Sequence, residues 1–312
     1  MINFRYHLIS LTAVFLALTI GLILGTAALN GPAMEAIEAT SQSLRDRNNA
    51  MRDEIEALQE ELQDDQSFAS EIAPSYLDGR LTGQKILLVA LPGAETEVVD
   101  AVEEKLDYAG ATSAGRISLL DDFLDPANND QLADLVDGVT PDTIEAPVTY
   151  DGVAAMSAIL AAVTTGSFEG APVEIAAGDI TTVTTGLTEL GMLTVETEPT
   201  GGATGVMLVG GAAAADSDAD ERNTAVVTIA TAFAVDDPTV YAASTSAGEG
   251  NPVVALRGDD IEAPVSTVNS VTAPQGQIGA VMALVDLIAD SSVHHLGPEG
   301  EEGVEGWLPD AA

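Results

Sequence analysis

The residues best suited to hold a metal ion are few in this chain. It contains no cysteine, which excludes thiolate ligands, disulfides and cysteine nucleophiles together. Two of its three histidines, His294 and His295, are adjacent in the sequence. Because imidazole is a common ligand of copper, this pair is the candidate metal site. A structural role for both side chains is the alternative, since two neighbouring residues rarely point at one ion.

Methionine thioethers also bind copper, but the four methionines in the second half of the chain are isolated from one another. None of them forms an M-x-x-M or M-x-M cluster. We therefore expect them to pack in the core as flexible apolar side chains. They are Met156, Met192, Met207 and Met282.

An acidic D-x-D-x-D run begins at Asp216 and resembles the start of a calcium-binding loop. Its sixth position is Glu221, where such a loop needs glycine, and its twelfth is Val227, where it needs glutamate. Asp218, inside the run, precedes a stretch that extends as a predicted helix to Ala234. We interpret the run as a helix cap rather than as a calcium site.

Two glycine turns follow predicted strands, at the place where a dinucleotide-binding fold holds pyrophosphate. They are the LPGA sequence at residues 91–94 and the pair Gly210 and Gly211, and neither has the G-x-G-x-x-G pattern. Glu95 and Glu97 follow the first turn, and carboxylates at a helix start repel phosphate. We expect no nucleotide. Since a G-x-S-x-G nucleophile motif is also missing, no catalytic residue and no enzymatic activity is predicted.

The charge balance is strongly acidic, with 10 lysines and arginines against 50 aspartates and glutamates and a formal net charge of −40. The acidic residues are spread along the chain rather than collected in one tail. Such a surface repels nucleic acid and anionic lipid headgroups, so no nucleic-acid partner is expected.

An uncharged apolar stretch at residues 8–29 predicts a membrane-spanning helix. At the helical rise it covers about 33 Å, enough to cross a hydrocarbon core of about 30 Å. Arg5 and His7 precede it and the first charges after it are acidic, so the N-terminus is expected in the cytoplasm and the bulk of the chain outside. We expect residues 1–30 to be a cytoplasmic tail and single-pass cell-membrane anchor, with a helix break at residues 30–32. A cleaved signal peptide is the alternative.

Apolar residues recur at alternating three- and four-residue spacing over residues 33–72, which predicts a coiled coil. A single amphipathic helix packed on its own domain is the alternative. Arg47 would face Arg52 of an identical parallel partner, so the expected partner is either a second copy or a different membrane protein. Gly21 and Gly25 in the membrane span add a face of small residues suited to helix association. The expected coil positions in contact are Asn48, Met51, Ile55, Leu58 and Leu62.

Predicted strands and helices alternate over residues 80–290, where continuous apolar strands indicate a Rossmann-like α/β domain with a mainly parallel sheet. Residues 252–256 are predicted as one of its strands. Residues 291–312, rich in glycine and glutamate, are predicted to form a flexible C-terminal tail.

The chain resembles the actinobacterial MctB family of copper transport proteins. The resemblance covers nearly the whole chain. It rests on INFRYHLISLTAVFLAL at residues 2–18, LPGA at 91–94, LVGG at 208–211, VSTVN at 265–269 and PQGQ at 274–277.

The resemblance implies an envelope protein with an anchor, a coil and an α/β domain, a role in copper efflux or homeostasis, and copper as the metal concerned. Members of the family are assigned to the mycolate outer membrane. Related proteins, named SteB, are implicated in cell separation with a membrane partner, SteA. The resemblance therefore leaves two functions open: copper transport, and a non-catalytic membrane-anchored scaffold that regulates cell separation through its coil and α/β domain.

Overall fold

The computed structural model describes residues 4–147, 149–244, 250–258, 261, 263–297, 306 and 308, and for residues 28–33 it describes the backbone alone. The chain divides into two compact units, Met1–Asp65 and Gln66–Ala312. The first unit is helical, whereas the second contains the sheet.

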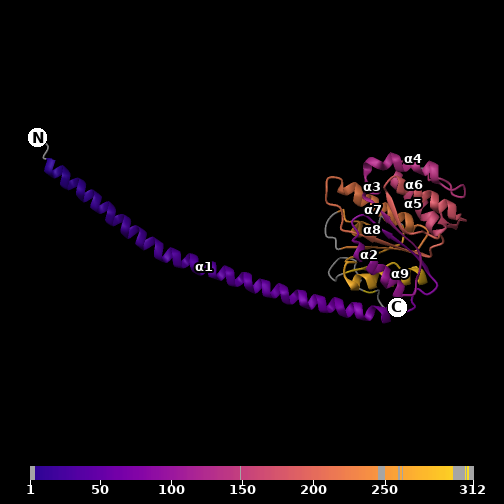
Figure 1. Cartoon of the computed structure of the whole chain (residues 1–312), viewed down its shortest axis with the longest axis horizontal. Coiled ribbons are helices and arrows are strands. Elements are labelled where there is room, and N and C mark those ends of the chain that lie inside the picture. Colours follow the sequence, from indigo (N-terminus) through magenta and orange to yellow (C-terminus); the bar gives the residue numbers. More distant parts are fainter. Residues whose placement is uncertain are drawn as a thin grey trace. The chain divides into compact units, whose positions relative to one another are not determined.

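The first unit belongs to one long helix, α1 (Phe4–Leu77), whose last turns belong to the second unit (Figure 1). The helix passes through residues 30–32 without ending, so the break predicted from Asn-Gly-Pro is wrong. A proline removes one backbone hydrogen bond of a helix, but the bonds before and after it can continue the same helix. Within α1, Phe4–Ala27 is apolar and long enough to cross a membrane, and it is the one such helix in the described part of the chain.

The second unit is built around a seven-stranded sheet with the order β5-β2-β1-β6-β7-β8-β9. All neighbouring strands pair in parallel except β5, which is antiparallel to β2. The strand order runs outward in both directions from β1 and β6, as in a doubly wound α/β fold. This confirms the predicted α/β class with a mainly parallel sheet. The strands are β1 (Lys85–Ala90), β2 (Thr112–Leu119), β5 (Leu193–Thr197), β6 (Gly205–Gly210), β7 (Thr239–Ala243), β8 (Val265–Val268) and β9 (His295–Leu296).

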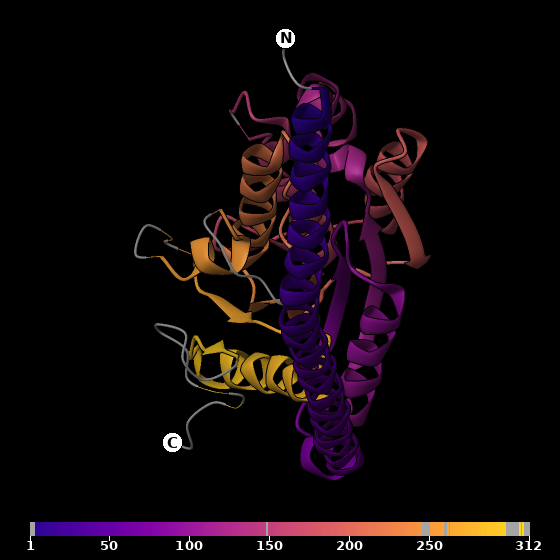
Figure 2. The ribbon, with the colours of Figure 1, turned by 90° about the vertical axis from the view of Figure 1, so that its left-hand side faces the viewer.

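Helices cover both faces of this sheet: α4, α5, α6 and α7 contribute to the core on one face, and α2, α9 and the end of α1 to the core on the other. In Figures 1 and 2 the orange α7 and the yellow α9 lie apart from each other, because they cover different faces of the sheet. A small hairpin, β3 (Ser167–Phe168) and β4 (Ala171–Pro172), follows α5. The helices are α2 (Thr96–Tyr108), α3 (Asp121–Leu124), α4 (Asn129–Val139), α5 (Gly152–Thr165), α6 (Ala177–Glu189), α7 (Ala219–Ala234), α8 (Pro252–Leu256) and α9 (Pro274–Asp290), with a short 3₁₀ turn at Pro126–Asn128.

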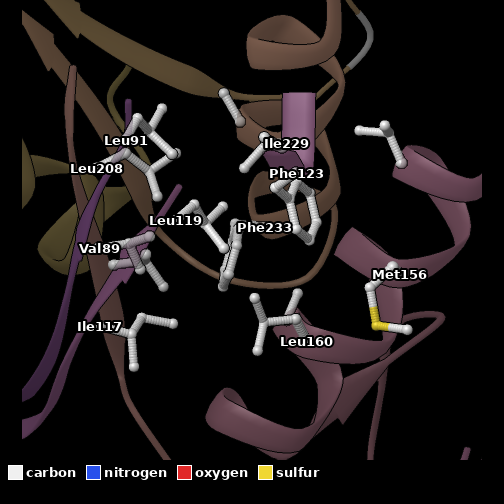
Figure 3. Close-up of a cluster of buried hydrophobic side chains, with 14 of the residues drawn as sticks. Val89, Leu91, Ile117, Leu119, Phe123, Met156, Leu160, Leu208, Ile229 and Phe233 are labelled. Carbon is white, nitrogen blue, oxygen red and sulfur yellow. The ribbon is translucent and has the colours of Figure 1, made fainter. Parts of the chain in front are cut away.

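The alternation of side chains along β1 explains the two cores. Leu87 and Val89 point into the core beneath α5 and α7, whereas Ile86 and Leu88 point into the core beneath α2 and α9. Because both faces are covered, every residue of β1 after the exposed Lys85 is apolar and buried. Figure 3 shows Val89 in the first of these cores.

Two local predictions in this unit are wrong. Residues 252–256 form the helix α8 rather than a strand, because the Asn251 side chain accepts a hydrogen bond from Val253 N at 2.9 Å and Pro252 holds the first helical position. A short apolar run does not distinguish the two structures, whereas the preceding Asn-Pro pair does. The predicted flexible tail also begins too early, since His295 and Leu296 form β9 and pair in parallel with β8.

Candidate functional site

A small cavity lies where the strand order reverses, at the carboxyl ends of β1 and β6. In doubly wound folds this is the usual place for a ligand. The turns after the two strands touch each other: a Cβ atom on Gly211 would lie 2.2 Å from the carbonyl oxygen of Gly93. Leu91 N also donates to Val209 O at 2.8 Å. The two glycines therefore allow the backbones of the two turns to touch, and both glycines line a cavity of about 160 Å³.

Tyr241, on β7, contributes a hydroxyl group to this cavity. The side chain is 3 % exposed, and a Cβ atom on Gly210 would lie 2.6 Å from its hydroxyl oxygen. Burial raises the pKa of the Tyr241 phenol well above its ordinary value, so the group stays protonated and can donate. Its hydroxyl makes no hydrogen bond with any residue that the structure describes.

Arg222, on α7, forms ion pairs at the rim of the same cavity. One guanidinium nitrogen contacts Asp121 and another lies 3.3 Å from Asp216. The two carboxylates together outweigh the charge of the arginine, which makes the rim unfavourable for an anion. Its Nε atom is buried and finds no acceptor in the described part of the chain.

Asn223 fixes the loop between β6 and α7. Its amide oxygen accepts from Ala214 N at 2.9 Å and its amide nitrogen donates to Ala214 O at 3.2 Å. Asp218 occupies the N-cap position of α7, as predicted. Its side chain makes no hydrogen bond to the first turn of the helix, so the predicted capping contact is wrong. Asp216, which begins the acidic run, pairs with Arg222 instead.

The two candidate metal ligands, His294 and His295, have different partners. His294 Nε2 lies 3.4 Å from a carboxylate oxygen of Asp286, on α9. His295 Nδ1 lies 2.9 Å from the hydroxyl oxygen of Thr267, on the neighbouring strand β8. Among the residues described, no group of three or more histidine, aspartate or glutamate side chains is placed to hold a metal ion. Metal binding by the two histidines stays a prediction.

The four isolated methionines lie in the core, as their spacing predicts. Each is at most 6 % exposed. They belong to both sides of the sheet, Met156 and Met192 to one core and Met207 and Met282 to the other.

The predicted contact positions of the coil are exposed on α1. Leu58 and Leu62 are 58 % and 55 % exposed, and Met51 and Ile55 are 60 % and 51 % exposed. Asn48 is also exposed. Around Gly21 and Gly25, the place of a Cβ atom has no neighbour within 4 Å in the described chain. A partner helix therefore has access to every one of these positions.

Sequence reasoning identified the Gly210-Gly211 turn but missed Tyr241, Arg222 and Asn223. Tyr241 lies inside an apolar strand, where a tyrosine is an ordinary core residue. The other two residues belong to a predicted helix with no recognisable motif. A signal was present only in the order of the elements, because a glycine turn after a central parallel strand marks the edge of the sheet where ligands bind.

Known proteins resemble this chain along almost its whole length. A family model described as "Copper transport outer membrane protein, MctB" matches residues 1–302. The Copper transporter MctB of Mycobacterium tuberculosis (strain ATCC 25618 / H37Rv) is 27 % identical over 304 residues, covering 95 % of this chain and 96 % of that protein. The Copper transporter MctB of Mycobacterium leprae (strain TN) is 26 % identical over 310 residues, covering 96 % of each chain. This match spans the apolar N-terminal helix and the parallel sheet, and by it the chain belongs to the MctB family.

Proposed function

We propose that this protein is a single-pass component of the cell envelope that acts in copper efflux or homeostasis, with most of its chain outside the cytoplasmic membrane. The family and the names of its relatives support the link to copper transport. The observation that carries the rest is the apolar helix Phe4–Ala27, of mean hydropathy 2.4 and without any buried part. Arg5 and His7 at its N-terminal end favour a cytoplasmic N-terminus.

A single membrane helix cannot enclose a pore, so transport by this protein requires further helices. The exposed small-residue face at Gly21 and Gly25 and the exposed apolar positions of α1 that follow provide surfaces for them. We propose that the protein assembles as a homodimer or with another membrane protein, and that copper movement depends on the assembly.

Deletion of the gene and measurement of cell-associated copper and copper tolerance test this function. A raised copper load that the intact gene restores to normal is the expected result. Complementation with Leu58→Glu and Leu62→Glu, compared with Ala50→Glu and Ala57→Glu on another face of the helix, asks whether assembly matters. An unchanged copper load after deletion would remove the proposal.

A second candidate is a scaffold that regulates cell separation, as in the SteB-like relatives that the sequence resembles. One observation favours it: in the described part of the chain no cluster of metal ligands is found, whereas large apolar side chains are exposed along α1. Affinity purification in mild detergent would then recover a division or envelope protein. Recovery of no such protein, together with normal cell separation in the deletion strain, would exclude the scaffold.

The orientation in the membrane can be tested separately. Protease added to intact spheroplasts is expected to digest the acidic α/β unit. Protection of that unit, or a mature N-terminus near residue 29, would show that the anchor or its orientation is wrong.

A further inference from the structure

We infer that the cavity between the β1 and β6 turns binds a small uncharged molecule that presents a carbonyl or hydroxyl oxygen to Tyr241. This inference goes beyond the proposed function, because it concerns the α/β unit alone and needs neither copper nor an assembled membrane helix. It follows from the hydrogen-bond donors, the charge and the size of the cavity.

Hydrogen-bond donors of two side chains that line the cavity have no partner in the described chain. The Tyr241 side chain is almost fully buried, lines the cavity and has no hydrogen-bond partner in the described chain. Arg222 Nε, on a side chain that also lines the cavity, is buried without an acceptor. Buried donors without partners are rare because each loses its hydration without replacement. Arg222 Nε is enclosed by the protein, whereas the Tyr241 hydroxyl is not among the buried unpaired atoms and can be reached from the cavity, so it is the donor to which an acceptor atom there can bind.

The charge of the rim restricts that acceptor. Asp121 and Asp216 already pair with Arg222, so the guanidinium has no excess charge to offer an anion. A carboxylate or phosphate would be repelled by the two aspartates. A cation would meet the positive guanidinium of Arg222, which already occupies both aspartates at this rim. An uncharged oxygen acceptor meets neither obstacle.

The volume of the cavity and its apolar lining residues restrict the size and polarity of the rest of the ligand. A volume of about 160 Å³ is too small for a nucleotide and close to the roughly 150 Å³ that holds a benzene ring in a protein core. Leu91, Leu124 and Val226 also line the cavity and offer apolar contacts. The expected ligand therefore has one oxygen acceptor on an apolar body of about six to nine non-hydrogen atoms.

The test uses the full-length protein in detergent micelles with its five tyrosines replaced by 3-fluorotyrosine. The ¹⁹F signal of Tyr241 is assigned by its loss in Tyr241→Phe. Benzamide is the probe, because it matches the size and carries an uncharged carbonyl, and benzoate is its charged counterpart. We expect benzamide to shift the Tyr241 signal to saturation while the signal of the fully exposed Tyr150 stays in place, and benzoate to bind at least about tenfold more weakly.

Variants separate a role in binding from a role in folding. Tyr241→Phe should weaken benzamide binding about five- to tenfold, measured on the ligand by saturation transfer, whereas Tyr150→Phe should leave it unchanged. Val226→Phe fills the cavity, so it should abolish the shift while it keeps the Tyr241 signal. The unfolding temperature of each variant shows that the fold is intact. A Tyr241 signal that benzamide does not move, equal binding of benzoate, or unchanged affinity in Tyr241→Phe would each overturn the inference.

Discussion

The two units of this chain place their apolar side chains in opposite environments. On α1 between Phe4 and Leu62, each large apolar side chain described is at least 49 % exposed. In the α/β unit, Leu87, Phe233 and Leu284 are fully buried. The parallel strands β1, β2, β6 and β7 each contribute apolar side chains to one or both cores. The hydrophobic effect acts on both units alike. The α/β unit therefore buries its apolar side chains within itself, whereas the helical unit leaves them exposed, and we expect a bilayer and other helices to cover them.

The largest expected effect tests the dependence of the helical unit on a partner. Leu58→Glu with Leu62→Glu should convert a dimer of residues 33–312 into monomers, measured by sedimentation. A buried leucine contributes about 1.5–3 kcal/mol, so the four leucines of a dimer contribute roughly 6–12 kcal/mol as an upper estimate. Ala50→Glu with Ala57→Glu adds the same charge away from the predicted seam and should leave the dimer intact.

An unchanged mass of the leucine variant would count against the coil. A wild-type fragment that is already monomeric would instead exclude the homodimer and leave a different membrane protein as the partner. Either result would change the comparison, because the helical unit would no longer depend on a second copy of itself.

The next effect tests the independence of the α/β unit. Phe233 is fully buried between α7 and the sheet, in the core that Figure 3 shows. Phe233→Ala should lower the free energy of unfolding by about 3–5 kcal/mol, because it removes apolar contact and leaves a cavity. Urea denaturation of the same fragment measures this change. Phe68→Ala removes the same atoms from a side chain that is 65 % exposed and should cost less than about 0.5 kcal/mol. Both residues lie in the second unit, so equal costs for the two variants would contradict the burial of Phe233 in its core.

A smaller effect concerns the contact between the two glycine turns. Gly211→Ala places a Cβ atom 2.2 Å from the Gly93 carbonyl oxygen, so the turns must separate at a cost of about 1–3 kcal/mol. Gly138→Ala, in α4, meets open space and should be neutral or stabilise the protein by up to about 1 kcal/mol. Urea denaturation of both variants measures the difference. A stable Gly211→Ala would show that the turns do not need their close approach.

The sequence predicted the sheet well because its strands are buried on both faces. The apolar run of β1 and that of β7 each leave few alternatives to a central parallel strand. The helix α8 was missed because its five residues are as apolar as a strand, and the deciding contact is a single hydrogen bond to the Asn251 side chain. The continuity of α1 through residues 30–32 was missed because Asn-Gly-Pro is a strong local signal against a helix.

The cavity could be predicted only in part. Gly210-Gly211 indicated an edge of the sheet, but nothing in the sequence shows that Gly93 comes within contact of Gly211 or that Tyr241 opens onto the same space. These contacts join residues about 120 and 150 positions apart, and they depend on the strand order. Local spacing contains no information about either.

The smallest expected effect is a pH dependence within the α/β unit. Burial raises the pKa of the Asp237 carboxyl, with a smaller contribution from Asp236, whereas hydrogen bonds from Thr165 and Ser167 oppose the rise. The folded protein therefore holds this proton more tightly than the unfolded chain. The stability that it contributes is present at pH values below the pKa of the unfolded chain and is lost as the pH rises through the folded pKa.

Asp237→Asn does not titrate and should become more stable relative to the wild type as the pH rises from about 3 to 7, by less than about 1 kcal/mol because the group is partly solvated. Urea denaturation at several pH values measures the difference. Asp137→Asn, which removes a carboxylate from the exposed surface of α4, reports the effect of net charge alone. A difference that shrinks with rising pH would show that the hydrogen bonds to the Asp237 carboxylate outweigh its burial. In that outcome, the half-buried charge of Asp237 would stabilise the α/β unit, although this unit buries its apolar side chains without a partner.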